Sequence, residues 1–329
     1  MIFQHTNLAR PIGALLIAAA IGALPSAALA EYPDRPIKLI VPQAAGSATD
    51  TVARILAAEL SPQLGGQTII VEDRPGAALT LGMDIVAKSP PDGYTLAVGP
   101  IGALAITRHM VKAPYVIERD FQPIGLIVRG HLMLVVSPKS EIKSVKDLIA
   151  EAKKAPGKLT NASSSNGSPG HVGGELFKFM TGTEIVHVPY RGGAQATNDL
   201  IAGHVQLMFE SLNSISPHAK SGAVRGLGVS GPKRSSAFPD MPTIAEAGVP
   251  GYDAGTWTSL VGPAGMPKDV VEKLNAALNR AIRSPGFVAR FAQIGDEAAG
   301  GTPQDLADTI AKDSAKWGDV IQRAGVKLD

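Results

Sequence analysis

Three turns in this chain consist largely of small or hydroxyl-bearing residues, and each runs into a segment with helical periodicity. They cover Ala45 to Asp50, Ser163 to His171, and Tyr190 to Ala194. The first amide N–H groups of a helix have no intrahelical partner, and the helix dipole adds positive potential, so such ends attract anions. Apart from Arg191, the turns contribute no obligatory cation. We therefore predict a pocket rich in hydrogen-bond donors, suited to a carboxylate or another small anion.

The first of these turns lies between an apolar strand at residues 37–41 and a helical pattern of apolar residues. Gly46 allows the backbone to bend without a Cβ penalty. Ser47 or Thr49 is suited to cap the helix, and Asp50 falls in the first helical turn, where the dipole favours an acid. The alternative is an ordinary strand-to-helix turn whose amides bind only water.

Four side chains in or near these turns have two interpretations that the sequence leaves open. His171 either donates to an anion or is a neutral, structurally bonded histidine. Tyr190 either closes over a ligand or packs at the end of a strand. Arg191 either contacts the ligand or is solvated, and Glu210 either faces the cleft or forms a salt bridge.

The sequence lacks the usual motifs for catalysis, metals and cofactors. The histidines do not have zinc-site spacing, there is no H-E-x-x-H, and no Gly-rich phosphate or dinucleotide loop follows the first strand. Ser168 and His171 are close in sequence, with Asp50 as an imaginable third member, but there is no G-x-S-x-G elbow. A serine hydrolase is thus the less favoured alternative, and we expect no metal, no cofactor and no enzymatic activity.

The composition argues against a polyanionic partner. The chain has 31 Lys and Arg against 29 Asp and Glu, and loss of a leader with one Arg leaves 30 − 29 = +1. Nucleic acid is therefore not an expected partner. Aromatic residues make up only 5% of the chain, which argues against a stacking platform for bases or sugars. With no cysteine, the fold must be stabilised by its cores.

Residues 1–30 have the pattern of an export signal. Arg10 precedes an almost wholly apolar run at residues 12–24, and Ala28-Leu29-Ala30 fits a signal-peptidase site. The apolar run is too short for a comfortable membrane span, and no cysteine follows it as a lipid attachment point. We expect cleavage after Ala30 and an exported, soluble mature protein.

Strand and helix signals alternate along the mature chain, which predicts parallel sheets with helices on both faces. Two apolar strands follow each other closely near residue 130, and a Pro-, Gly- and Ser-rich connector covers residues 231–252. We predict two α/β domains, one from residues 31–128 plus 254–329 and the other from residues 129–253. Two chain crossings make a hinged pair, and a ligand is expected in the cleft between the domains.

Short motifs in a specific order cover nearly the whole mature chain. They are Tyr32-Pro33-Asp34-Arg35-Pro36-Ile37, Val41-Pro42 with Gly46 and Ala48-Thr49-Asp50, Val71-Glu72-Asp73-Arg74-Pro75-Gly76-Ala77, Pro91-Asp92-Gly93-Tyr94-Thr95-Leu96, Pro156-Gly157-Lys158-Leu159, Val186-His187-Val188-Pro189-Tyr190-Arg191-Gly192, Gly231-Pro232-Lys233-Arg234-Ser235 and Pro242-Thr243-Ile244-Ala245-Glu246-Ala247-Gly248. Each motif is weak alone. In this order and spacing, the chain resembles the periplasmic receptors of tripartite tricarboxylate transporters, also called Bug receptors.

The resemblance implies a periplasmic binding protein of the Venus flytrap type, with two α/β domains, each a mostly parallel sheet flanked by helices, and two hinge crossings. Such a receptor binds a small organic acid and delivers it to the membrane permease subunits of its transporter; we expect a monomer in the periplasm. The first turn would hold a ligand carboxylate, partly through water, and the other two turns would hold its other end. The predicted ligand-binding residues are Ala45, Gly46, Ser47, Ala48, Thr49, Asp50, Gly76, Ala77, Ser164, Ser165, Asn166, Gly167, Ser168, His171, Tyr190, Gly192, Gly193 and Glu210.

Several positions depart from the family pattern around the expected cleft. Gln43 replaces an aromatic residue, Ser47 a second glycine, and Glu210 a shorter Asp, while Ala78-Leu79-Thr80 stands where Gly-Gly-Asn is usual and Ser168-Pro169-Gly170 where a Thr/Ser-rich triplet is usual. The ligand could therefore differ from citrate or a simple dicarboxylate. Thr80 and Glu210 suggest a ligand with a polar or amino group. Remaining alternatives are a receptor of another transporter type and a ligand sensor.

Overall fold

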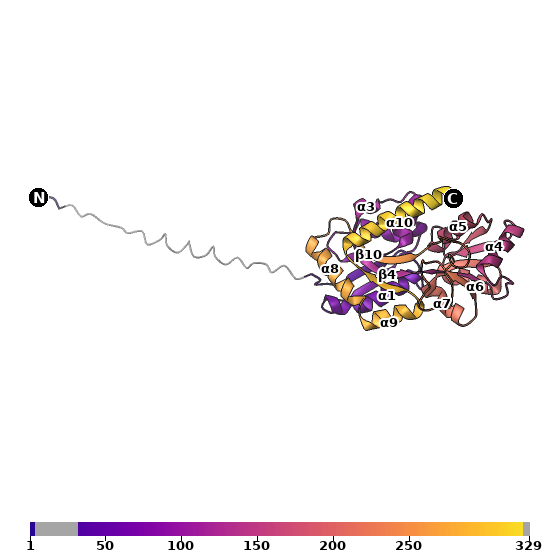
Figure 1. Ribbon diagram of the computed structural model, residues 1–329. Coiled ribbons are helices and arrows are strands. Elements are labelled where there is room, and N and C mark those ends of the chain that lie inside the picture. The colour runs from indigo at the N-terminus through magenta and orange to yellow at the C-terminus, as the bar shows by residue number, and fades with distance from the viewer. Residues whose placement is uncertain (4–31, 325–329) are drawn as a thin grey trace.

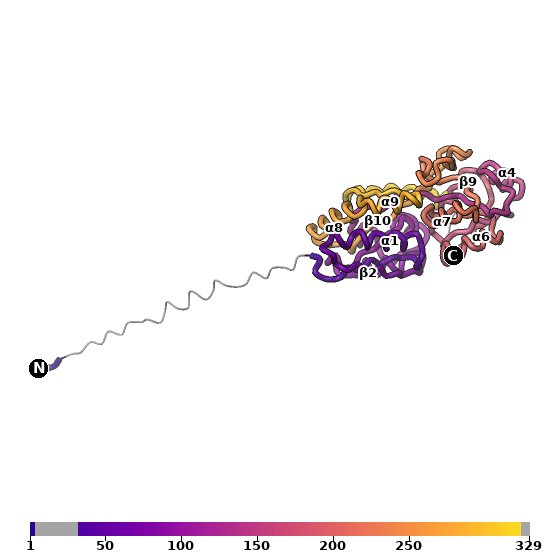
Figure 2. The backbone as a smooth tube through the Cα atoms, turned by 90° about the horizontal axis from the view of Figure 1, so that it is seen from below, coloured from indigo at the N-terminus to yellow at the C-terminus, as the bar shows by residue number. Residues whose placement is uncertain are grey.

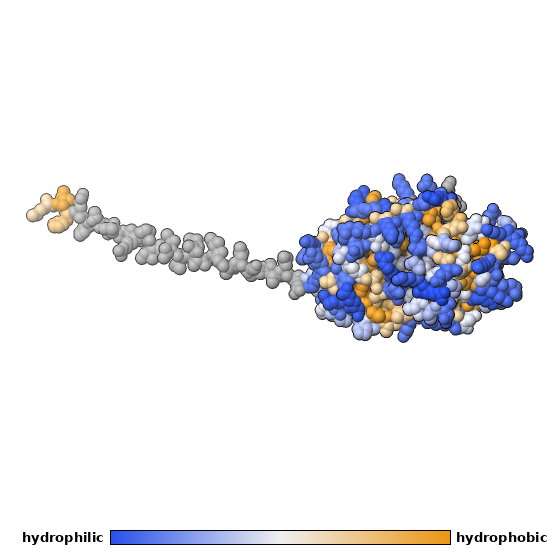
Figure 3. All heavy atoms as spheres, viewed as in Figure 1, coloured by the Kyte–Doolittle hydropathy of each residue, from blue (hydrophilic) through white to orange (hydrophobic). Residues whose placement is uncertain are grey.

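The computed structural model describes residues 1–3 and 32–324. The predicted cleavage site after Ala30 and nearly all of the expected leader lie outside the described residues. The chain folds into two lobes, seen side by side in Figure 1 and again from below in Figure 2. Polar side chains cover most of the visible face of both lobes, with small apolar patches between them (Figure 3). None of the helices within the described ranges has the length and apolar character needed to cross a membrane.

The first lobe is built on a six-stranded sheet with the order β11-β4-β10-β3-β1-β2. Strands β2 and β3 flank β1 in parallel, whereas β10 runs antiparallel to both β3 and β4, and β11 runs antiparallel to β4. The strand bounds are β1 Ile37–Val41, β2 Ile69–Asp73, β3 Thr95–Pro100, β4 Phe121–Gly130, β10 Thr256–Pro263 and β11 Glu297–Gly300.

Helices cover both faces of this sheet. Alternate strand residues point to opposite faces, so Leu39 packs in the core formed with α1, α8 and α9, while Ile40 packs in the core formed with α2 and α10. The helix bounds are α1 Ala48–Leu60, α2 Thr80–Ala87, α3 Ile117–Asp120, α8 Lys268–Ala281, α9 Pro285–Ile294 and α10 Pro303–Ala324, with short 3₁₀ or π turns at Ser61–Leu64, Ala77–Leu79, Gly102–Ile106 and Thr107–His109.

The second lobe is built on a five-stranded sheet with the order β7-β6-β8-β5-β9. Strand β6 is parallel to β7 and β8, and β5 is antiparallel to β8 and β9. Helices α4 and α5 pack on one face, and α6 and α7 on the other. The bounds are β5 Leu132–Val136, α4 Val145–Lys154, β6 Thr160–Ser163, α5 Pro169–Thr181, β7 Val186–Pro189, α6 Gly193–Ala202, β8 Leu207–Ser211, α7 Leu212–Lys220 and β9 Arg225–Val229.

The predicted α/β class with two sheets and flanking helices is confirmed, but the sheets are mixed rather than mostly parallel. The reason is the path between the lobes. Strand β4 ends at Gly130 and β5 begins at Leu132, so only His131 separates strands of different sheets. Strand β10 returns from the second lobe beside β4 and therefore runs opposite to it.

One turn beside α2 has an unusual backbone. The sequence favours a helix from Ala77, whereas the regular helix begins at Thr80. Ala77, Ala78 and Leu79 have positive φ values of 47°, 50° and 74°. The Thr80 hydroxyl donates to the Ala77 carbonyl at 2.7 Å, and the Thr107 hydroxyl donates to the Ala78 carbonyl at 3.2 Å. These bonds hold the turn in place and direct Leu79 towards the space between the lobes.

Candidate functional site

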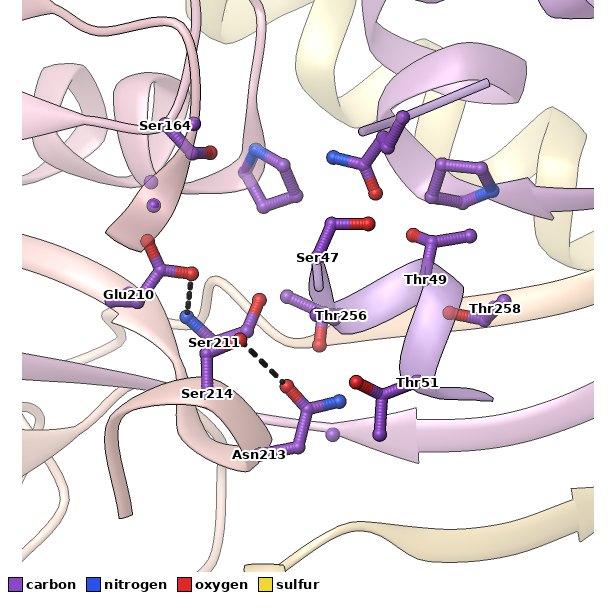
Figure 4. A pocket seen from close by; sticks show the side chains of 18 of the residues that line it. Ser47, Thr49, Thr51, Ser164, Glu210, Ser211, Asn213, Ser214, Thr256 and Thr258 are labelled. Carbon is purple, nitrogen blue, oxygen red and sulfur yellow. Dashed lines mark hydrogen bonds between the residues drawn. The ribbon is translucent and has the colours of Figure 1, made fainter. Parts of the chain in front are cut away.

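A cleft of about 380 Å³ lies between the two lobes. Its walls come from the turn before α1, the turn before α6, the β8–α7 junction and strand β10. In Figure 4, Glu210 and Ser164 lie on one wall, and Ser47, Thr49 and Thr51 lie on the opposite wall. Both lobes thus contribute polar groups to a single space.

The N-terminus of α1 presents free backbone amides to this cleft. Gly46 has a φ of +78° that favours glycine. Ser47 caps the helix by accepting a hydrogen bond from the Asp50 amide at 3.2 Å. The amides of Ala48 and Thr49 have no hydrogen-bond partner among the described residues. They are the orphan donors that an anion can use.

Asp50 stabilises this turn instead of facing the cleft. Its Oδ2 accepts a hydrogen bond from the Gly46 amide at 2.8 Å, and its Oδ1 lies 2.7 Å from Nε of Arg54. The residue is buried and does not line the cleft. Its carboxylate therefore braces the loop from behind.

The N-terminus of α6 is open in a different way. Its cap residue is Gly192, which offers no side-chain acceptor. The amides of Gly193, Ala194 and Gln195 have no partner within residues 32–324, and the first helical bond runs from the Ala196 amide to the Gly192 carbonyl at 3.4 Å. Gly192, Gly193 and Ala194 all line the cleft.

The Ser-rich turn before α5 uses several of its polar groups in internal hydrogen bonds. The Ser168 hydroxyl accepts from the His171 amide at 3.3 Å, and Nδ1 of His171 accepts from the Gly167 amide at 3.1 Å. The Ser163 hydroxyl donates to the Ser165 carbonyl at 2.9 Å. From this turn and the start of α5, the cleft is lined by Ser164, Pro169 and Gly170.

His171 is a structural histidine. It is 4% exposed and stacks on His187, with ring centroids 3.7 Å apart. Burial, with smaller contributions from His187 and Lys178, lowers the pKa of His171 to about 3. The ring is therefore neutral at physiological pH. In the described part of the chain it makes no hydrogen bond to the Ser168 hydroxyl, so the pairing that a serine hydrolase needs is missing.

Tyr190 and Arg191 also lie outside the cleft lining. The Tyr190 hydroxyl donates to Oδ2 of Asp199 at 2.7 Å, and burial followed by this bond raises the pKa of Tyr190 to about 12. Arg191 is exposed and does not line the cleft. The turn contributes to the cleft through its glycines, which follow these two residues.

Half of the predicted site residues meet in the cleft. The cleft lining includes Ala45, Gly46, Ser47, Ala48, Thr49, Ser164, Gly192, Gly193 and Glu210. Residues outside the lining are Asp50, Gly76, Ala77, Ser165, Asn166, Gly167, Ser168, His171 and Tyr190, and Thr80 is outside it as well.

Glu210 is a buried acid in the cleft wall. It is 7% exposed, and its Oε1 accepts a hydrogen bond from the Ser211 amide at 2.9 Å. Burial raises the pKa of Glu210 to about 7, although the Ser211 bond opposes the shift. A Cβ on Gly193 would lie 3.0 Å from Oε2 of Glu210. The glycine therefore lets this carboxyl group approach the start of α6.

Sequence reasoning missed part of the lining. The β8–α7 junction contributes Ser211, Asn213 and Ser214, and the α9–β11 turn contributes Asp296. The first group had a usable signal, because its polar residues lie where a strand meets a helix, as in the three predicted turns. Asp296 follows Gly295, the C-cap of α9, and had no comparable signal.

The described lining of this cleft contains no permanent cation. Its lining, taken from the described residues, includes His218 but no Lys or Arg. In the same part of the chain, no group of three or more His, Cys, Asp or Glu is placed to hold a metal ion. Backbone amides, hydroxyls and the side-chain amides of Gln43 and Asn213 are among the groups available to bind an anion.

The comparisons define the class of protein. The model of the tripartite tricarboxylate transporter family receptor, TctC, matches residues 52–326, and the chain belongs to this family. Protein BugT of Bordetella pertussis is 36% identical over 325 residues, covering 98% of this chain and 99% of that protein. A Pseudomonas sp. strain P51 protein, named UPF0065 protein in the tcbD–tcbE intergenic region, is 38% identical over 291 residues, covering 88% of this chain and 86% of that protein.

Solved structures agree with this assignment. R. palustris Rpa4515 with adipate has a TM-score of 0.86 and 37% identity, covering 90% of this chain and all of that chain. MatC from Rhodopseudomonas palustris with bound malate has a TM-score of 0.83 and 31% identity, covering 88% of this chain and all of that chain. The two-lobed fold is therefore that of the family.

Proposed function

We propose that this protein is a periplasmic receptor that binds a small carboxylate in the cleft between its lobes and delivers it to the permease subunits of a tripartite tricarboxylate transporter. The observation that carries the proposal is that the open N-termini of α1 and α6 face one cleft from opposite lobes. Family membership supports the transporter partner. The adipate and malate in the related structures support a small organic acid as ligand.

The binding energy requires several contacts at once. One helix terminus contributes about 0.3–1 kcal/mol to a bound anion, and about 2 kcal/mol at most when partly buried. Micromolar affinity needs about 8 kcal/mol. Charge-assisted hydrogen bonds contribute about 1.5–3 kcal/mol each. The amides of Ala48, Thr49, Gly193 and Ala194 therefore act together, in a cleft whose two walls move onto the ligand.

The proposal extends to the arrangement of the mature protein. We place the first domain at residues 31–128 plus 254–329 and the second at residues 129–253, with export and cleavage after Ala30. The protein acts as a monomer. The predicted residues outside the lining, such as Asp50 and His171, take the role of shaping the turns that bind the ligand.

The test is thermal unfolding of residues 31–329 in the presence of small acids and their matched neutral amides. The protein is first unfolded and refolded to remove any co-purified ligand. A ligand at 100 times its dissociation constant stabilises the native state by about 2.7 kcal/mol. At about 2–4 °C for each kcal/mol, the midpoint should rise by about 5–10 °C for an acid and not for its amide. If no acid raises the midpoint more than its amide does, the carboxylate proposal is wrong.

A further inference from the structure

Two buried carboxyl groups from different lobes line the same cleft. Glu210 ends β8 in the second lobe and is 7% exposed, while Asp296 precedes β11 in the first lobe and is 5% exposed. When ionised, such groups repel an anion in the same cleft. The presence of two buried carboxyl groups therefore bears on which chemical groups the ligand carries.

Each of these carboxyl groups is only half satisfied by the protein. Oε1 of Glu210 accepts from the Ser211 amide at 2.9 Å, and Oδ2 of Asp296 accepts from Nδ2 of Asn213 at 2.8 Å. Within residues 32–324, Oε2 of Glu210 and Oδ1 of Asp296 accept no hydrogen bond. No Lys or Arg among the described lining residues neutralises either group.

A buried carboxylate without a cation is costly, so it either takes up a proton or binds a positive group. Burial raises the pKa of Glu210 to about 7, which leaves about half of the molecules ionised at neutral pH. An approaching ammonium group would favour the ionised form further. The titratable side chains that share the cleft with Glu210 are Asp296 and His218.

The cleft therefore offers groups for both signs of charge. The free amides at the starts of α1 and α6 prefer a negative group, whereas the unpartnered Oε2 of Glu210, beside the start of α6, prefers a hydrogen-bond donor with positive charge. We propose that the ligand is an amino carboxylate, with its carboxylate at the N-terminus of α1 and its protonated amine against Glu210. This inference rests on the proposed function and narrows it to one class of acid.

The experiment is titration calorimetry at pH 7.5 with matched pairs of acids that differ only in the amine. The pairs are L-aspartate and succinate, L-glutamate and glutarate, and γ-aminobutyrate and butyrate. The amine-bearing member of at least one pair should bind about tenfold tighter or more, because it adds a charge-assisted hydrogen bond. In Glu210→Gln this preference should fall to within about threefold, because the neutral amide cannot form an ion pair.

Glu175→Gln is the matched control. Glu175 is 6% exposed, is paired with Lys178 at 2.7 Å and does not line the cleft. This variant removes the same charge from another buried site and should keep the amine preference. The thermal midpoint of each variant without ligand shows that it is folded.

The outcomes separate the two proposals. If acids bind but the amine-free member of every pair is equal or tighter, the amino carboxylate inference is overturned and the carboxylate receptor stands. If Glu210→Gln keeps the wild-type preference for the amine-bearing acid, Glu210 does not bind the amine and the inference is overturned. If none of the acids binds, while refolded protein is native, the proposed function fails with the inference.

Discussion

The N-termini of α5 and α6 both face the cleft from the second lobe, yet they differ in how many of their first amide N–H groups are free. At α5, Pro169 has no N–H and the His171 amide bonds to Ser168, so only the Gly170 amide remains free in the described part of the chain. At α6, Gly192 caps nothing and three amides remain free.

The difference shows that a hydroxyl-rich turn is not in itself a better anion site than a glycine turn. The Ser168 side chain at α5 competes with a ligand for the His171 amide, because N-cap side chains accept from the first turn. Glycines at α6 leave those amides for a ligand. The α5 end is thus stabilised by its own residues, whereas the α6 end has donors available for binding.

The largest expected effect concerns the titratable groups at these two ends. Glu210, beside α6, has a pKa raised to about 7 from 4.5, so its contribution to stability is complete below pH 4.5 and is lost as the pH rises to 7. Each pKa unit corresponds to about 1.4 kcal/mol. The free energy of unfolding of Glu210→Gln relative to wild type should therefore rise by about 3 kcal/mol between pH 4.5 and 7.

His171, at the α5 end, acts in the opposite sense, because its lowered pKa removes stability as the pH falls below 6.5. The quantity to measure is therefore the difference in unfolding free energy between Glu210→Gln and wild type, without ligand, from pH 4.5 to 8. A difference that does not change with pH would show that the pKa of Glu210 is not raised in the native state.

The second prediction is that an acceptor at Gly192 closes the α6 site. The φ of Gly192 is 167°, which any residue can adopt, and a Cβ there meets no atom within 4 Å. In Gly192→Asp the new carboxylate should accept from the free amides and repel the ligand, which weakens carboxylate binding by about thirtyfold. Gly192→Ala supplies the control, since it adds a Cβ without an acceptor and should bind nearly as wild type. Equal affinity of the Asp variant, measured by calorimetry, would exclude the α6 amides from binding.

A third variant removes one donor from α1. Ala48 is the first helical residue, a position where proline is tolerated, and Ser47 has the extended backbone that a following proline prefers. Ala48→Pro should reduce carboxylate affinity by about tenfold, the equivalent of one charge-assisted hydrogen bond. Lys268→Pro makes the same change at the exposed start of α8 and should leave affinity unaltered. Ligand titrations of the two variants would distinguish a lost donor from a general effect of proline.

The smallest effect is expected at α5. Ser168→Ala removes the N-cap acceptor and should lower the free energy of unfolding by about 1 kcal/mol. Because the Ser168 side chain does not line the cleft, affinity should change by less than about threefold. Chemical denaturation and calorimetry on the same sample measure both quantities. A large loss of affinity without a loss of stability would reverse the assignment of α5 as the self-stabilised end.

The sequence predicts the positions of strands and helices better than it predicts which strands are parallel or antiparallel. Apolar runs bounded by proline identify strands such as β1, whose observed bounds, Ile37–Val41, match the predicted residues 37–41. The antiparallel entry of β10 could not be derived, because it depends on the return of the chain from the other lobe. The Gly-rich start of α6 was recognisable from residue types. The inward position of His171 was not, because it depends on stacking of this α5 residue against His187 on strand β7.

The backbone of the turn at Ala77, Ala78 and Leu79 fixes part of the cleft wall before a ligand binds. Left-handed backbone costs a residue with a Cβ about 1–2 kcal/mol, and here three consecutive residues adopt it where the resemblance leads one to expect two glycines. Hydroxyls from Thr80 and Thr107 hold this strained path. The conformational cost of this backbone is met when the chain folds. The cleft wall at Leu79 therefore needs no further ordering when a ligand binds.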